Sequence, residues 1–313
     1  MRILFFLFSF VISHMHYAQD CSQTSTNFIP LADLGKNTFE GFTGGKYPGG
    51  SNAIPSLHYN NGLELSQQIQ PLNKGGETDI SNGKIGFIVL GFSTAAMTGR
   101  YVRNMHEIIN TDSQLKIIIG AQGGRDINAM TSEKSDYWIK VDSALRENDM
   151  SAEQVQIIWL SSSDVQAHAL PFPAQSNMQA EKYRMMLQNI KRYYPNIKIV
   201  FLSDRTYAGY IGNDAGPQEL KEPTAYYNSW AVKWVIEKQI MNEAGYTRDV
   251  IPFIDWGTLL WTNGETGNEK GYTWDCTDAG KGGIHPSAKG RAKEATRVYL
   301  FFRNHPYTQK WFN

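Results

Sequence analysis

The chain has 313 residues, a length that suits one large domain or two small ones, and we favour one. Thirty Lys plus Arg residues balance 30 Asp plus Glu residues, and the isoelectric point is about 7.1. This neutral balance lacks the electrostatic signature of nucleic-acid binding or of an anionic membrane surface, so we expect neither partner.

Residues 1–19 have the layout of a secretory signal peptide. Arg2 precedes an apolar stretch from Ile3 to Ile12, which is too short to span a bilayer. Small and polar residues follow, so we expect cleavage near Ala18/Gln19 and a soluble protein exported to the periplasm or the medium. A buried N-terminal strand is the less favoured alternative. Asp20 stands where a lipoprotein signal needs a small residue before the cysteine.

Cys21 and Cys276 are the two cysteines of the chain. In an oxidising compartment they can pair and tie the mature N-terminus to a C-terminal loop. Two separate thiols remain the alternative.

The chain divides into a lead-in and a main domain. Residues 20–80 are rich in Gly, Pro and Asn, which predicts an irregular segment packed on the body of the protein. In residues 81–313, short apolar runs alternate with amphipathic stretches. We expect strands at 85–91, 115–120, 155–160, 197–203 and 250–256, and helices at about 97–110, 135–148, 177–193, 223–243 and 286–304.

This alternation predicts an α/β fold: a doubly wound sheet of about five parallel strands with helices on both faces. Ligands of such sheets bind beyond the carboxyl ends of the strands. The residues that directly follow each strand are therefore the candidates for a site.

Ser93 follows the first of these strands, in "GFST", ahead of a helix. A serine in this turn is exposed at the sheet edge, and the N–H groups of the helix start can stabilise an oxyanion. A simple helix cap is the equally weighted alternative. Ala95 replaces the second glycine of the G-x-S-x-G nucleophile elbow.

The next three strand ends carry further candidates. Gly123 and Gly124 allow close approach of the backbone to a ligand, and an N–H group here can join that of Ser93 in an oxyanion hole. A simple turn is the alternative. Ser161 and Asp164 can contact a substrate, or begin a polar loop. Arg205 and Tyr207 can clamp a carboxylate or stack on a sugar, although an Asp-Arg step is more commonly a structural ion pair.

His285 lies ahead of the last predicted helix, at the same edge of the sheet as Ser93. A histidine and a serine placed in this way can meet as base and nucleophile although they are far apart in sequence. We find no spacing of His, Cys or carboxylates typical of a metal site and no phosphate loop, so we expect no cofactor.

Together these segments resemble the SGNH, or GDSL-like, hydrolase superfamily. "GFS" is similar to its first block, "GAQGG" to its second, and "GGIHPS" to its last. The segments "QVQIIWL", "SDRTYAGY", "AVKWVIEKQI" and "TWDCTD" look like those of a set of exported bacterial proteins of unassigned function. The likeness covers roughly residues 25–305. It implies a flavodoxin-like sheet and a serine-histidine centre.

Two departures from that pattern concern the catalytic acid and the third block. Gly282 stands where the superfamily has an Asp three residues before the histidine, so Asp278 or Asp275 is the candidate acid, and a backbone carbonyl that orients the imidazole is the alternative. Ser161, Ser162 or Ser163 replaces the Asn of the third block. The resemblance implies an esterase that acts on an acylated small molecule or polysaccharide. The alternative is a binding protein for glycans that has the hydrolase frame without its chemistry.

Overall fold

The computed structural model describes residues 18–110, 114–166, 170–215 and 218–313. The main sheet consists of β3 (Ile85–Gly91), β4 (Leu115–Ile119), β5 (Val155–Ser161), β6 (Ile199–Ser203) and β7 (Phe253–Trp256). The helices of this region are α3 (Ser93–Ile109), α4 (Asn128–Thr131), α5 (Asp136–Glu147), α6 (Ala174–Tyr193), α7 (Thr224–Ile240), α8 (Ala288–Asn304) and α9 (Gln309–Phe312), with the 3₁₀ turns η2 (Ala152–Gln154) and η3 (Gln218–Leu220).

The five strands are all parallel and lie in the order β4-β3-β5-β6-β7. This is the order of a flavodoxin-like doubly wound sheet, which confirms the predicted fold class. The chain winds outward in both directions from β3, so the crevice of the switch point lies between the ends of β3 and β5. Ser93 follows β3 directly and is thereby placed at this point.

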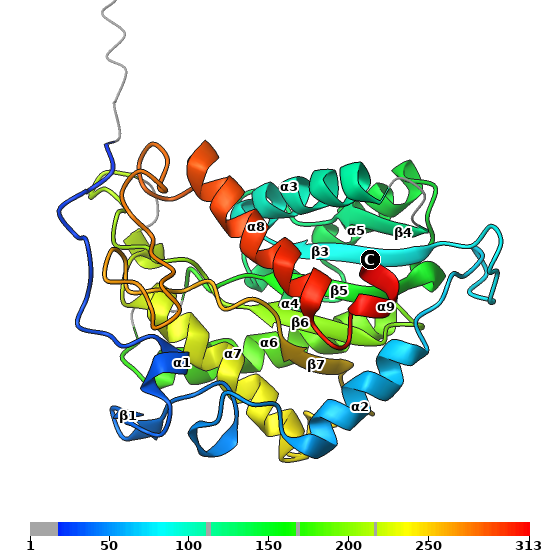
Figure 1. Cartoon of the computed structure of the whole chain (residues 1–313), viewed down its shortest axis with the longest axis horizontal. Helices are drawn as coiled ribbons and strands as arrows, with labels where there is room; N and C mark the ends of the chain where they lie inside the picture. Colours follow the sequence, from blue (N-terminus) through cyan, green and yellow to red (C-terminus); the bar gives the residue numbers. More distant parts are fainter. Residues whose placement is uncertain (1–17, 111–113, 167–169, 216–217) are drawn as a thin grey trace, which may run out of the picture.

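Alternate residues of the strands build two separate cores. Ile88 and Leu90 of β3 face α5, α6 and α7, whereas Phe87 and Val89 face α3, α8 and α9. Both faces of the sheet are therefore covered, which explains why the strands read as continuous apolar runs. Figure 1 shows α8 crossing in front of the sheet, close to α3.

The lead-in wraps around the main domain. It contains α1 (Leu31–Leu34), β1 (Thr38–Phe39), β2 (Phe42–Thr43), η1 (Pro48–Gly50) and α2 (Ser56–Gln67). Phe28 stacks on Tyr226 of α7 at 4.6 Å between ring centroids, and the Tyr47 hydroxyl donates to Asp255 of β7 at 2.7 Å. The 12-residue helix α2 differs from the irregular segment that the turn-rich composition predicts, because packing of Leu65 against the core stabilises it.

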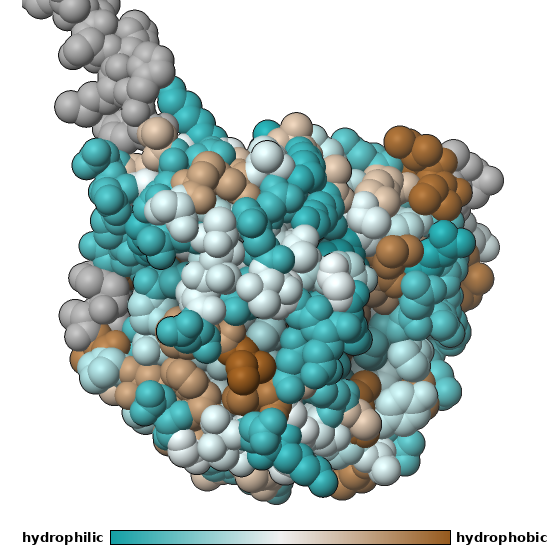
Figure 2. Space-filling view, turned by 60° about the vertical axis from the view of Figure 1, so that its left-hand side comes forward, coloured by the Kyte–Doolittle hydropathy of each residue, from teal (hydrophilic) through white to brown (hydrophobic). Residues whose placement is uncertain are grey.

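Within the described residues, the helices are too short or too polar to cross a membrane. Figure 2 turns forward the side of the molecule that lies on the left in Figure 1. Hydrophilic and neutral residues predominate there, and the apolar residues form small groups.

Candidate active site

Ser93 lies at the sharp turn between β3 and α3, and Gly91 makes that turn possible. The φ of Gly91 is +128°, and a Cβ atom at this position would lie 1.9 Å from the Ser161 carbonyl oxygen on the neighbouring strand. Only glycine fits such a position. The helix begins at Ser93 itself, four residues earlier than predicted, with Phe92 as the N-cap and no side-chain capping bond. The Ser93 hydroxyl therefore does not act as a helix cap.

The side chain of Ser93 instead contacts His285. The imidazole Nε2 lies 2.8 Å from the serine Oγ, although the two residues are 192 positions apart. Both side chains are partly exposed. This distance is within the range required for a base that takes the proton of a nucleophile.

The surroundings of His285 favour its neutral form. Partial burial lowers the pKa of the imidazole below its ordinary value of 6.5, and the nearby Arg291 guanidinium lowers it further. A neutral imidazole with Nε2 toward the serine can accept the hydroxyl proton at neutral pH.

The other ring nitrogen, Nδ1, carries the proton in this form and donates to no residue that the structure describes. Asp278, the candidate acid, is fully buried and binds elsewhere: its carboxylate lies 2.6 Å from the Lys293 ammonium and 3.3 Å from that of Lys289. Asp275 likewise binds Lys289, at 2.7 Å. The structure thus brings Ser93 and His285 together as a pair, whereas both candidate acids form salt bridges with lysines of α8.

Gly282, at the position where the superfamily has its acid, belongs to a tight loop. Its φ is +77°, and its carbonyl oxygen accepts a hydrogen bond from Gly212 N at 3.1 Å. The next residue, Gly283, packs so closely on the Tyr210 carbonyl that a Cβ atom would lie 1.9 Å from it. Gly282 and Gly283 therefore determine the backbone path of the loop that carries His285.

The loop of Gly123 and Gly124 lies next to the Ser93 turn, since Gln122 N donates to Gly91 O at 3.0 Å. A Cβ atom on either glycine would meet nothing within 4 Å, so both border open space. Within the described part of the chain, their N–H groups and that of Ser93 have no backbone acceptor. These donors are available to an oxyanion.

The side chains of Ser161 and Asp164 make structural contacts within the protein at this edge of the sheet. The Ser161 hydroxyl donates to the Asp204 carbonyl at 3.0 Å, so it is directed into the sheet. Asp164 is completely buried, where it accepts from Asn128 Nδ2 at 2.8 Å and from the Lys182 ammonium at 2.6 Å. Their contacts join the loop after β5 to α4 and α6, and leave neither side chain directed at a substrate.

Arg205 and Tyr207 are also buried. Arg205 donates to the Leu220 carbonyl at 2.9 Å, and its guanidinium lies 5.5 Å from the ring centroid of Phe92. The Tyr207 hydroxyl donates to the Gln23 carbonyl of the lead-in at 2.6 Å. The predicted clamp for a carboxylate or sugar does not form, because the lead-in covers this strand end. Arg205 supports Ser93 indirectly, through Phe92.

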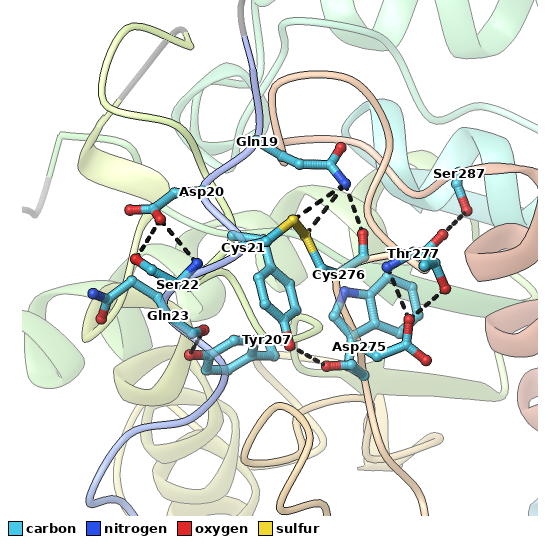
Figure 3. Close-up of a disulfide and its surroundings, with 12 residues drawn as sticks. Gln19, Asp20, Cys21, Ser22, Gln23, Tyr207, Asp275, Cys276, Thr277 and Ser287 are labelled. Atoms are coloured by element: carbon cyan, nitrogen blue, oxygen red, sulfur yellow. Dashed lines mark hydrogen bonds between the residues drawn. A yellow bond between two sulfur atoms is a disulfide. The ribbon is translucent and has the colours of Figure 1, made fainter.

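A disulfide between Cys21 and Cys276 fastens the loop of His285 to the lead-in. Figure 3 shows this bond with Gln19, whose amide donates to the Cys276 carbonyl at 2.9 Å. Farther along the loop, the Ser287 hydroxyl donates to the Thr277 carbonyl at 2.7 Å. The loop that presents His285 is therefore closed at its base, and the open question of the two cysteines is answered by their pairing.

Sequence reasoning missed Tyr137 and Glu294, which lie behind the site. Tyr137 of α5 contacts Gly91 through its hydroxyl, and Glu294 of α8 is buried beside α3, near Thr98. Both residues belong to amphipathic helices, and no local motif distinguishes them. No cluster of three or more potential metal ligands occurs among the described residues.

Comparison with known proteins leaves the chain without an assigned family. No family model matches the sequence, and no curated protein is similar enough to be a relative. Several solved structures resemble the fold, and three of them have a TM-score of 0.36 each. They are a candidate SGNH hydrolase from Slackia heliotrinireducens (13% identity; 70% of this chain and 99% of that one), the lipase Lip_vut3 from a goat rumen metagenome (14%; 71% and 100%) and the periplasmic domain of a lipopolysaccharide acetyltransferase from Salmonella ser. Paratyphi A (13%; 79% and 97%). Likenesses this distant assign no activity, so the functional argument depends on the site.

Proposed function

We propose that this protein is an exported serine esterase that removes acyl groups from a carbohydrate through a Ser-His centre. The observation that carries the proposal is the 2.8 Å contact between Ser93 Oγ and His285 Nε2. A serine is a weak nucleophile until a positioned base takes its proton, and this geometry supplies that base.

In the proposed reaction, Ser93 Oγ attacks the acyl carbonyl carbon while His285 Nε2 takes the hydroxyl proton. The tetrahedral intermediate collapses as the imidazolium returns that proton to the leaving alcohol, which leaves an acyl-serine. Water then repeats the sequence and releases the acid. Backbone N–H groups of Ser93 and Gly124 are the proposed oxyanion donors, and each donor of this kind is typically worth about 10²-fold or more in rate.

Export and the carbohydrate substrate are proposed from other features of the chain. The apolar run that ends at Ile12, within the proposed signal peptide of residues 1–19, favours export, but residues 1–17 lie outside the described part of the chain. The Cys21–Cys276 disulfide is typical of an oxidising compartment. The carbohydrate substrate is proposed from the sequence resemblance to SGNH hydrolases and from the aromatic content of 12%, since aromatic rings offer flat apolar surfaces to sugar rings.

The test is hydrolysis of a chromogenic acetyl ester by the mature protein and by Ser93→Ala. We expect the substitution to lower kcat/KM by about 10³-fold or more. Ser81→Ala is the matched control, because Ser81 is exposed and precedes β3, at the opposite end of the strand from the Ser93 turn. Equal rates for wild type and Ser93→Ala would remove Ser93 from the mechanism.

A second candidate function is glycan binding without hydrolysis. It is favoured by Gly282 at the position of the acid and by the absence of a carboxylate at His285 Nδ1 among the described residues. In a serine protease, loss of the corresponding acid costs about 10⁴ in kcat. A fluorophosphonate probe separates the two functions: an adduct on Ser93 supports the esterase, whereas affinity for a polysaccharide with no adduct supports the binding protein.

A further inference from the structure

A hollow of about 490 Å³ lies beyond the end of β7. Gly257 and Thr258, which follow that strand, line it together with Arg297 of α8 and Lys46 of the lead-in. Neither Ser93 nor His285 borders it. Since β7 is three strands from β3 in the sheet, the two strand ends are about 14 Å apart. The hollow is thus a separate site on the same edge of the sheet.

Two lysines without a salt bridge face this hollow. Lys46 and Lys270 form no hydrogen bond through their ammonium groups and no ion pair within the described residues. The Lys46 ammonium lies 5.3 Å from the ring centroid of Tyr47, and burial lowers its pKa, as does repulsion by Lys270, while Asp255 acts in the opposite direction. An anion bound between these ammonium groups would relieve their repulsion.

The position of Lys46 is fixed by its backbone. Its N–H donates to Asn52 Oδ1 at 3.2 Å, and its carbonyl oxygen accepts from the Trp256 indole at 2.8 Å. Asn268 orders the opposite wall in the same way, because its Oδ1 accepts from the N–H groups of Lys270 and Tyr272, each at 3.1 Å. The backbone on both walls of the hollow is therefore held by hydrogen bonds, and the half-buried Lys46 side chain is more restricted than that of the exposed Lys270.

An aromatic ring lies beside these charges. The Arg297 guanidinium covers one face of Tyr272 at 4.0 Å from the ring centroid, and the tyrosine is 37% exposed, which leaves ring surface open. Leu300 and Phe301 add apolar surface to the lining. Within the described structure, the Thr258 hydroxyl is buried without a hydrogen-bond partner. A ligand with hydroxyl groups could provide that partner.

We propose that this hollow binds a carboxylate-bearing sugar unit of an acidic oligosaccharide. Lys46 and Lys270 contact the carboxylate, the open surface of Tyr272 packs on the pyranose ring, and Thr258 pairs with a sugar hydroxyl. Asp33 and Glu269 also line the hollow, which limits its positive charge and disfavours ligands with several adjacent charges. Binding here requires no step of the chemistry proposed at Ser93.

The probe is tri-galacturonic acid, titrated calorimetrically into the mature Ser93→Ala protein so that turnover cannot occur. We expect saturable binding that weakens with added salt, and much weaker binding of neutral galactotriose and of citrate. Lys46→Gln and Lys270→Gln should each weaken binding by about tenfold. Tyr272→Ala should also weaken it, whereas Lys134→Gln, on an exposed side chain outside the hollow, should leave it unchanged.

Three results would overturn the proposal: no binding of tri-galacturonic acid, equal binding of galactotriose, or equal binding of citrate. Unchanged affinity in both lysine variants would do the same. Because the titration uses a protein without the serine hydroxyl, failure here is independent of the outcome of the ester hydrolysis test. Thermal denaturation of each variant, compared with the parent protein, shows whether a lost signal reflects misfolding.

Discussion

The Tyr137 hydroxyl bridges both backbone polar atoms of Gly91: it accepts from the N–H at 3.0 Å and donates to the carbonyl at 3.0 Å. Tyr137 is fully buried, so no solvent competes for these bonds. Because Gly91 sets the turn that presents Ser93, Tyr137 is a positioning residue for this proposed nucleophile.

We therefore expect Tyr137→Phe to leave the Gly91 N–H unpaired and to lower the free energy of unfolding by about 1–3 kcal/mol. In the same variant, kcat for an acetyl ester should fall while KM changes little. Denaturant unfolding and steady-state kinetics check the two effects. A loss of stability with unchanged kcat would show that Tyr137 supports the fold without positioning Ser93.

The depressed pKa of His285 predicts activity at mildly acidic pH. The base works as the neutral imidazole, so kcat/KM should fall only as the pH drops through a value below 6.5. Removing the Arg291 charge, as Arg291→Met, should move this acidic limb to higher pH. The measurement is a pH profile of ester hydrolysis for both proteins. If the midpoint of the acidic limb in the wild-type profile lay above pH 6.5, a carboxylate would have to stabilise the imidazolium.

The disulfide at the base of the histidine loop should affect both stability and activity. Replacing Cys21 and Cys276 with serine should lower the free energy of unfolding by about 2–5 kcal/mol. The loop then loses its covalent attachment to the lead-in, so we also expect a lower kcat. Wild-type protein treated with a reductant is the control and should match the double variant. Full activity in both would mean that the remaining hydrogen bonds suffice to position His285.

Placing at position 282 the Asp that the superfamily has there should not create a Ser-His-Asp triad. Gly282→Asp introduces a side chain at a φ of +77°, which costs about 1 kcal/mol. The existing Gly212 N to Gly282 O bond keeps the loop on its present path. We expect lower thermal stability and no gain in esterase rate. A rise in kcat accompanied by a shift of the acidic limb to higher pH would contradict this expectation.

Glu294 should make stability depend on pH. Burial raises its pKa from 4.5 to about 7, with a Thr98 hydrogen bond and the Arg297 and Arg205 charges opposing this effect. The folded state therefore retains a proton that the unfolded state releases between pH 4.5 and 7, and stability falls over that interval as the pH rises. Across this interval the free energy of unfolding should fall by about 3 kcal/mol in the wild type, and Glu294→Gln should abolish that fall. Denaturant unfolding at pH 5 and pH 8 measures it, and parallel curves for the two proteins would exclude the effect.

The sequence predicted the sheet because each strand is buried on both faces and reads as an unbroken apolar run. The meeting of Ser93 and His285 followed from topology, since parallel strands place their carboxyl ends at one edge. The start of α3 was placed too late, because Ser93 itself lies in the first helical turn rather than in the loop before it.

The polar residues behind this edge were not predictable in the same way. Asp278 pairs with Lys293, which lies on the helix after the glycine-rich loop, and the path of such a loop is not encoded by local propensity. Tyr207 was expected in the crevice, but its hydroxyl binds the Gln23 carbonyl of a lead-in whose course has no periodic pattern. Contacts of this kind depend on tertiary packing.

The disulfide between Cys21 and Cys276 also determines when the proposed site can be completed during biogenesis. These thiols are 255 positions apart, so the first cysteine to leave the ribosome waits for nearly the whole polypeptide before its partner exists. Contacts between such distant segments form slowly, and chains grow from the N-terminus. Truncated or unfinished chains that end before Cys276 lack both the partner of Cys21 and His285, so the proposed Ser93–His285 site can form only in a nearly complete chain.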